Sequence, residues 1–193
     1  MSQVISNSNT KRLSIVVAKG SPIFLNEIPY RSSRPLTSGI NELPHCQLSD
    51  NPAENVWASL CSRIADCQNS LFKGSVGPRP SLTPLPDTQA FFLDNCPCKT
   101  PMVPRHVGTE WAHVHGKNDG SLHLVLSDAD VDTVIKKNWA ERHPILWMGG
   151  GFPQGLVLVY APRTAEEIET VIGILTASYR FARGDFIPLG YSE

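Results

Sequence analysis

The feature that most constrains the fold of this 193-residue chain is a pair of short runs on either side of a glycine-rich turn. In each run, histidines or other residues alternate with apolar residues. Successive side chains of a β-strand point to opposite faces, so His113 and His115 would share one face. Residues 116–120 carry the Gly, Asn and Asp typical of a turn between antiparallel strands, which predicts a β-hairpin. In that hairpin His113 lies opposite His123, with Cβ atoms about 4.5–5.5 Å apart. The pattern therefore predicts three histidines on one face.

The two faces of this predicted hairpin differ in character. The alternate positions are apolar and predict a side that faces the core: Ala112, Val114, Leu122, Leu124 and Leu126. On the histidine side, the same alternation places Trp111 and Val125 beside the imidazoles. Glu110 has the opposite parity, so it would reach the histidines only if a bulge interrupted the strand.

The remaining periodicity predicts an α+β fold, in which helices cover a mostly antiparallel sheet. Ser127 and Thr164 are suitable N-caps and Gly184 a suitable C-cap, whereas Asn51 or Asp50 could cap the first helix. Asp128, Asp130 and Asp132 are expected on a solvated helix surface. The proline-rich stretch 74–86 predicts an irregular connection. The predicted helices span 53–72, 127–138 and 165–183, and the predicted strands outside the hairpin span 88–93 and 156–160.

The chain divides into two parts at about residue 52. Residues 1–52 are punctuated by prolines and predict an extended N-terminal arm, with a short strand at 13–18. Residues 53–193 are enough for a single α+β domain with its own core. We therefore expect one domain with an arm that lies on it or is partly disordered.

The composition excludes several classes of partner. The net charge is −1 and no long run of Lys or Arg is present, so we expect neither nucleic acid nor a membrane surface as partner. The apolar run at 13–18 is too short for a signal peptide or a membrane span, which predicts a cytoplasmic protein. Five cysteines, an odd number, argue against a disulfide framework. Cys96 and Cys98 lack the spacing of a zinc ribbon.

Several motifs in the C-terminal half resemble a family of small fungal and bacterial proteins that is known as the luciferase domain family. The resemblance covers roughly residues 85–183. It implies an α+β fold and, for fungal members, a role in natural-product biosynthesis. The chain departs from the family pattern at 145–155 and in the Cys- and Pro-rich stretch 94–104. The motifs that carry the resemblance are Ala112-His-Val-His115, Asp119-Gly-Ser-Leu-His123, Leu126-Ser-Asp-Ala-Asp130, Trp139-Ala-Glu-Arg-His-Pro144 and Leu158-Val-Tyr-Ala-Pro-Arg163.

Three interpretations of the hairpin histidines stay open. Three neutral imidazoles that converge on one point suit zinc, iron, nickel or copper. The same rings could instead act without metal as acids, bases or hydrogen-bond donors. They could also be structural and bond to one another and to the backbone. In addition, the turn after the second helix could bring His143 or Glu141 to the open face of the hairpin.

The segment 145–155 combines bulky apolar residues with three consecutive glycines, Gly149 to Gly151. It could be core, a homodimer contact, or a hinged lid over an apolar ligand. We expect it to border a ligand pocket on the histidine side. Its glycines do not follow the pattern of a dinucleotide-binding loop, and no phosphate-binding motif is present elsewhere.

These features predict an enzyme that needs no organic cofactor and binds an apolar small molecule. Its predicted reaction is a cyclisation or isomerisation, for example a pericyclic [4+2] cycloaddition. A metal-dependent enzyme or metal-binding protein, with a divalent transition metal on His113, His115 and His123, is the first alternative. A non-enzymatic ligand carrier or interaction domain is the second. The predicted catalytic residues are His113, His115, His123 and His143, and the predicted substrate-binding residues are Trp111, Val125, Trp147, Met148 and Phe152.

Overall fold

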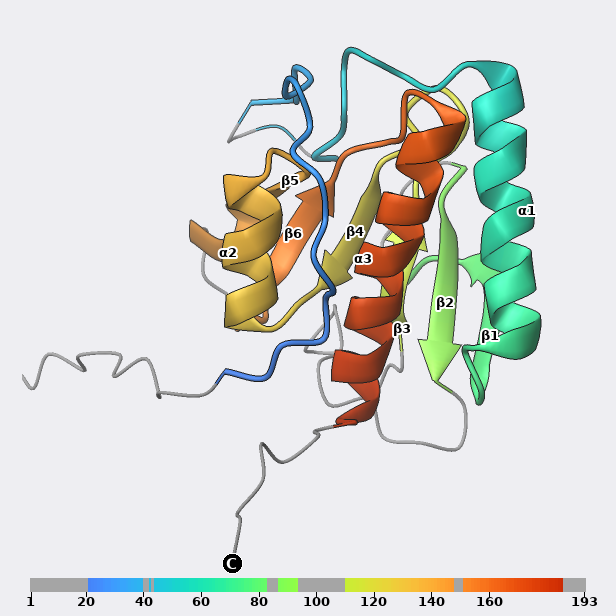
Figure 1. Ribbon diagram of the computed structural model, residues 1–193, viewed down its shortest axis with the longest axis vertical. Helices are drawn as coiled ribbons and strands as arrows, with labels where there is room; N and C mark the ends of the chain where they lie inside the picture. The colour runs from blue at the N-terminus through green and yellow to red at the C-terminus, as the bar shows by residue number, and fades with distance from the viewer. Residues whose placement is uncertain are drawn as a thin grey trace, which may run out of the picture.

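An antiparallel sheet of six strands, in the order β1-β2-β3-β4-β6-β5, forms the centre of the computed structural model (Figure 1). The structure describes residues 21–39, 42, 44–82, 87–93, 110–147 and 151–185. The predicted α+β fold with a mostly antiparallel sheet is confirmed. The strands are β1 Ser75–Pro80, β2 Gln89–Leu93, β3 Glu110–Val114, β4 Leu122–Val125, β5 Ala140–Arg142 and β6 Leu156–Val159. The helices are α1 Glu54–Ser70, α2 Asp128–Lys136 and α3 Ala165–Arg183, and a 3-10 helix, η1, spans Pro144–Trp147.

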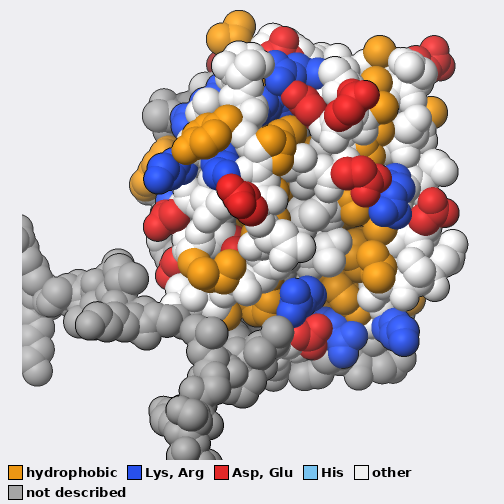
Figure 2. All heavy atoms as spheres, viewed as in Figure 1, with side chains coloured by type: hydrophobic (Ala, Val, Ile, Leu, Met, Phe, Trp, Pro, Cys, Tyr) orange, Lys and Arg blue, Asp and Glu red, His pale blue; other side chains and the backbone are white. Residues whose placement is uncertain are grey.

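The three α-helices lie on one face of the sheet, with α3 across its middle (Figure 1). The apolar face of the hairpin and the alternate residues of β6 point toward them and form the main core with the inner sides of the helices. Seen from the helix side, acidic and basic side chains are mixed with apolar ones, and no described histidine is visible (Figure 2). The other face of the sheet is therefore left for the histidines.

The helix ends follow their capping residues. The Ser127 side chain accepts a hydrogen bond from the Asp130 amide, and Thr164 does the same for Glu167. Gly184 ends α3 in the left-handed conformation, with φ at 73°, which glycine adopts without a steric penalty. These three predictions are confirmed. The predicted cap of α1 is wrong, because Ala53 occupies the N-cap position and makes no side-chain hydrogen bond there.

Periodicity predicts neither of the two edge strands. The stretch 74–86 is not irregular throughout as expected, because Ser75–Pro80 pairs with β2 as β1. Proline is tolerated there because an edge strand has one side without a ladder partner. At the other edge, β5 has three residues, too few to show an alternating pattern. Edge strands such as these carry little sequence signal.

The described part of the N-terminal arm, from residue 21 to 52, is extended and is fixed to α2 by a buried carboxylate. Asp130 is fully buried, and its two side-chain oxygens accept hydrogen bonds from the amides of Phe24 and Leu25, at 3.1 and 3.2 Å. The prediction of a solvated surface position for Asp130 is therefore wrong. A buried carboxylate requires such partners, because burial without them would cost several kcal/mol. The predicted strand at 13–18 lies outside the described residues.

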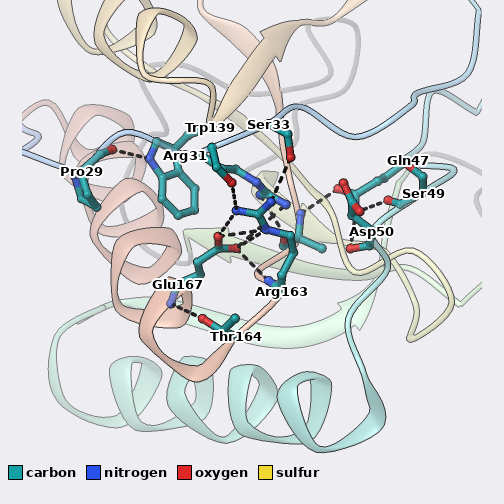
Figure 3. Close-up of polar contacts among 12 residues, drawn as sticks. Pro29, Arg31, Ser33, Gln47, Ser49, Asp50, Trp139, Arg163, Thr164 and Glu167 are labelled. Carbon is teal, nitrogen blue, oxygen red and sulfur yellow. Dashed lines mark hydrogen bonds and ion pairs between the residues drawn. The ribbon is translucent and has the colours of Figure 1, made fainter.

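A second anchor of the arm is Arg31, whose side chain is enclosed between the arm, β6 and α3 (Figure 3). Its guanidinium carbon lies 5.4 Å from the ring of Trp139 and 5.6 Å from that of Tyr160. One of its nitrogens donates to the Ala161 carbonyl at 3.0 Å, and another lies 4.0 Å from the Glu167 carboxylate. The arm is therefore bound to the domain through aromatic and charged contacts, and beyond Arg31 it continues to the histidine face.

Among the described residues, no helix has the length and apolar character that a membrane crossing requires.

Gly155 offers a test of the close approach between the start of β6 and the end of β4. A Cβ at this position would overlap the Leu126 carbonyl oxygen and lie 3.0 Å from its carbonyl carbon. We expect Gly155→Ala to lower the free energy of unfolding by more than about 2 kcal/mol, because the obstacle is backbone rather than a movable side chain. Gly173→Ala is the control: a Cβ there would meet nothing within 4 Å, and alanine should add about 0.5–1 kcal/mol inside α3. Urea denaturation of both variants measures the difference, and equal stabilities would contradict the proposed packing.

Candidate functional site

The hairpin register brings the three predicted histidines together. His113 pairs with His123 across β3 and β4, and the His115 amide donates to the Ser121 carbonyl at 2.9 Å. The ring centroid of His123 lies 4.8 Å from that of His113 and 4.6 Å from that of His115. All three residues are buried, with exposed fractions of 5% or less. This part of the prediction is confirmed.

A β-bulge changes the face on which two neighbouring residues lie. Phe91 pairs with Ala112, but Phe92 pairs with Glu110, so Trp111 is an extra residue in β3. The indole of Trp111 packs against Phe72 and Tyr179 on the helix side, with ring centroids 5.4 Å away in both cases. The predicted position of Trp111 beside the histidines is therefore wrong.

The same bulge turns Glu110 toward the histidines. One carboxylate oxygen of Glu110 lies 2.8 Å from His113 Nδ1 and also accepts from the Ser81 hydroxyl at 2.9 Å. The other oxygen accepts from the Leu82 amide at 2.8 Å. Glu110 is 1% exposed, so this contact is shielded from solvent. The carboxylate that parity alone excluded is thus part of the site.

A second carboxylate binds His115. Asp119, in the turn of the hairpin, contacts His115 Nδ1 through one oxygen and accepts from the Ser121 amide through the other at 3.0 Å. Burial alone would raise the pKa of the Asp119 carboxyl, but the hydrogen bonds from His115 and Ser121 hold it below its usual range. His113 and His115 therefore each have Nδ1 against a carboxylate.

Two further histidines complete the cluster. His143 lies next to His123, with ring centroids 4.5 Å apart, and its Nδ1 accepts from the Ile145 amide at 3.1 Å. His45 comes from the N-terminal arm, 5.2 Å from the ring of His143. Nε2 of His45 lies 2.7 Å from a Glu141 oxygen, and its Nδ1 lies 3.1 Å from the Ser38 hydroxyl. All five histidines that the structure describes thus form one group, which we call the histidine cluster: His45, His113, His115, His123 and His143.

The interior of the histidine cluster favours uncharged imidazoles. Burial lowers the pKa of His113, and burial together with the neighbouring histidines lowers that of His123 well below the usual value. Burial, followed by the proximity of His45, lowers the pKa of His143 to about 3. These three rings are neutral at pH 7. In that form each has one donor nitrogen and one acceptor nitrogen.

Two imidazole nitrogens of the histidine cluster have no partner. Nε2 of His115 and Nε2 of His123 are buried and make no hydrogen bond within the part of the chain that the structure describes. Leaving a buried polar atom unpaired costs roughly 1–3 kcal/mol. A bound ion, water or ligand is one explanation for such an atom, and a catalytic role is another. His113, His115 and His123 could also hold a metal ion, because each offers one nitrogen within 4.8 Å of the others.

A cleft of about 880 Å³ adjoins the histidine cluster at His115. It lies where the hairpin turn meets the arm, α1 and the first two strands. Its lining combines apolar surface, including Trp57 and three prolines, with the charged residues Arg79, Asp87, Lys117 and Asp119. The size is that of a small-molecule site. Among the described residues, His115 is the member of the histidine cluster that lines this cleft.

The predicted substrate-binding residues lie elsewhere. Phe152 packs, together with Ile145, against Val125 and Leu156, and Val125 follows His123 on the same face of β4. This small apolar cluster therefore lies on the histidine side, as predicted for the segment 145–155. Trp147 is 66% exposed, and Met148 lies outside the described residues. None of the predicted substrate-binding residues is among the described lining of the cleft, so their role in binding stays a prediction.

Comparison with known proteins confirms the predicted resemblance. Residues 108–178 match the family model described as Luciferase domain. The chain is also similar to proteins named luciferase from Neonothopanus nambi and Armillaria gallica, each 36% identical over 102 residues. The matched segment is 49% of this chain and 38% of each relative. The chain thus spans well under half the length of these relatives. No solved structure was found that matches the chain.

The matched segment contains four members of the histidine cluster and both carboxylates that contact them. The fifth member, His45, lies outside the segment, in the arm. The sequence does not predict its role, because an isolated histidine in a stretch without periodicity gives no indication of what it contacts. Glu141, which contacts His45, lies on this face, as the position of the turn after the second helix allows.

The lowered pKa values predict that acid destabilises the protein through the histidine cluster. His143 stays neutral in the folded chain down to a pKa of about 3 but takes up a proton near pH 6.5 when unfolded. The folded state therefore loses stability as the pH falls from about 6.5 toward 3, by about 1.4 kcal/mol per pH unit for one such group. Urea denaturation at pH 7.5, 6 and 5 should show this decline, with a shallower slope for His143→Gln. If the pH dependence of stability is the same in His143→Gln as in wild type, folding does not lower the pKa of His143.

Proposed function

We propose that this protein is an enzyme that acts on a small organic molecule at the histidine cluster. One observation carries the proposal: the imidazole of His115, with its unpartnered nitrogen, lies where the cluster meets a cleft of small-molecule size. The name luciferase, given to the relatives, supports catalysis by this domain. Their names support nothing more specific, since the matched segment is 38% of their length.

A ligand carrier would need the apolar surfaces but not the polar interior. Five histidines and three carboxylates, those of Glu110, Asp119 and Glu141, are gathered on one face of the sheet. They cost desolvation energy that apolar residues would avoid. The two unpartnered nitrogens add to this cost. Such a costly arrangement is more typical of a reactive centre than of a carrier, which supports the enzyme.

The reaction class that we propose is the cyclisation or isomerisation expected from the sequence. Imidazoles held by carboxylates can polarise a carbonyl or hydroxyl of the substrate, and the cleft can hold one reactive conformer. A pericyclic ring closure is one member of this class. The substrate would have an apolar body and a polar end, in keeping with the mixed lining of the cleft. An organic cofactor is not part of the proposal.

A complementation experiment tests the function before the substrate is identified. The gene is deleted in the source organism, and the strain is complemented with wild type, His115→Gln or Lys136→Gln. We expect deletion to remove one metabolite and accumulate its precursor, as measured by liquid chromatography and mass spectrometry. Wild type and Lys136→Gln, an exposed position on α2 on the helix side of the sheet, should restore the product, whereas His115→Gln should not.

Two results would refute the proposal. One is a metabolite profile that deletion does not change. The other is full restoration by His115→Gln at the same protein level as wild type. A precursor that accumulates in the deletion strain can then be given to the purified protein, which should convert it.

The segment 145–155 gives a separate prediction. Because the Trp147 side chain is 66% exposed, Trp147→Ala should change the free energy of unfolding by no more than about 0.5 kcal/mol. If the segment covers the substrate, the same variant should convert the accumulated precursor several-fold more slowly. Phe152→Ala is the comparison, because Phe152 packs on Val125 and its loss should lower stability as well. Unchanged turnover in Trp147→Ala would exclude this residue from the substrate site.

A further inference from the structure

We propose that His113, His115 and His123 bind a divalent transition-metal ion. This inference rests on the proposed function only in placing the reactive centre at the histidine cluster. The three side chains each offer one nitrogen, and these nitrogens lie within 4.8 Å of one another in a buried setting. Three imidazoles from one β-hairpin are a ligand set suited to zinc and to other late first-row metals.

The carboxylates determine which nitrogen of each ring is available. Glu110 lies 2.8 Å from His113 Nδ1, and Asp119 contacts His115 Nδ1. A carboxylate at Nδ1 accepts a hydrogen bond from the N–H there, so Nε2 of the neutral ring keeps its lone pair. Metal-binding histidines almost always have their second nitrogen bound in this way, to a carboxylate or a carbonyl. His113 and His115 both have this arrangement.

Two of the three Nε2 atoms are also left without a partner among the described residues. Nε2 of His115 and Nε2 of His123 are buried and unbonded. Nε2 of His113 lies 2.9 Å from His123 Nδ1 and forms a hydrogen bond with it. A cation held by these rings would occupy the two lone pairs that the protein leaves unused and would replace the hydrogen bond at His113 Nε2. The unpartnered nitrogens thus point to a ligand independently of the ring distances.

The two other members of the histidine cluster have their nitrogens engaged differently. His143 Nδ1 accepts from the Ile145 amide, which in the neutral ring places the proton on Nε2. Both nitrogens of His45 are used, by Ser38 and Glu141. Neither residue is therefore a ligand in this proposal. They provide matched controls, since they are buried histidines of the same cluster.

Both oxygens of each carboxylate already accept hydrogen bonds from protein groups. Glu110 accepts from Ser81 and Leu82, and Asp119 accepts from Ser121. They orient the rings and do not compete for the ion. Three protein ligands leave a coordination position open to a water or a substrate, as in catalytic zinc sites.

The test uses the full-length protein, purified without an affinity tag, stripped with a chelator and titrated with Zn²⁺ or Co²⁺. We expect about one equivalent of tightly bound metal by calorimetry and elemental analysis, and a Co²⁺ absorption spectrum typical of nitrogen ligands. His113→Gln, His115→Gln and His123→Gln should each weaken Zn²⁺ binding at least 10-fold. Glu110→Gln should weaken it by about 10–100-fold. His45→Gln and His143→Gln should stay within about 3-fold of wild type.

Folded wild-type protein that takes up no metal on reconstitution would overturn the inference. So would a loss in His45→Gln or His143→Gln equal to that in the three ligand variants. Circular dichroism would show a ligand variant that fails to fold. The Co²⁺ spectrum of wild type and the Zn²⁺ affinity of Glu110→Gln then test the metal site.

The metal site and the proposed function can fail separately. Folded protein that takes up no Zn²⁺ but converts the accumulated precursor would refute the metal site and leave the enzyme. Tight Zn²⁺ binding on the three histidines, with no metabolite changed by deletion, would leave the metal site and refute the enzyme.

Discussion

The extra residue in β3 determines the chemistry of both faces of the sheet. Without the bulge at Trp111, strict alternation would direct the indole toward the histidines and Glu110 toward the helices. A buried glutamate among Phe72 and Tyr179 would have no partner there, and its burial would cost several kcal/mol. With the bulge, the indole fills the core under α3, and the carboxylate reaches His113. One local irregularity thus serves both the packing of the core and the polarity of the site.

The path of the N-terminal arm depends on the same division of the sheet into a helix side and a histidine side. It starts on the helix side, where Asp130 holds the amides of Phe24 and Leu25, and passes the buried Arg31 before it reaches the histidine face. There His45 joins the histidine cluster and is held by Glu141. The two charged anchors fix the path of the arm, whose described residues contain one isolated β-bridge, Thr37–Gln47, and no helix. A histidine from the arm therefore meets histidines from the hairpin at a defined distance.

The parts of this structure that the sequence predicted are those with a local cause. The hairpin follows from alternation and turn chemistry, and the ends of α2 and α3 follow from Ser127, Thr164 and Gly184. Other features depend on tertiary contacts and leave no local pattern. The face of Glu110 depends on how β3 pairs with β2, and the burial of Asp130 depends on a segment about 105 residues earlier. His45 is the clearest case, since its role follows from the path of the arm and not from its neighbours in sequence.

The histidine cluster must be stabilised by the rest of the fold. Neutral buried imidazoles and two unpaired nitrogens lower the stability of the histidine face. The opposite face compensates with a continuous apolar core, to which the hairpin, β6 and all three helices contribute. Because β3 and β4 carry both faces, rigid packing on the helix side also limits the movement of the histidines on the other. The positions of the carboxylates and imidazoles are thus determined by the core behind them, which is the condition for a preorganised site.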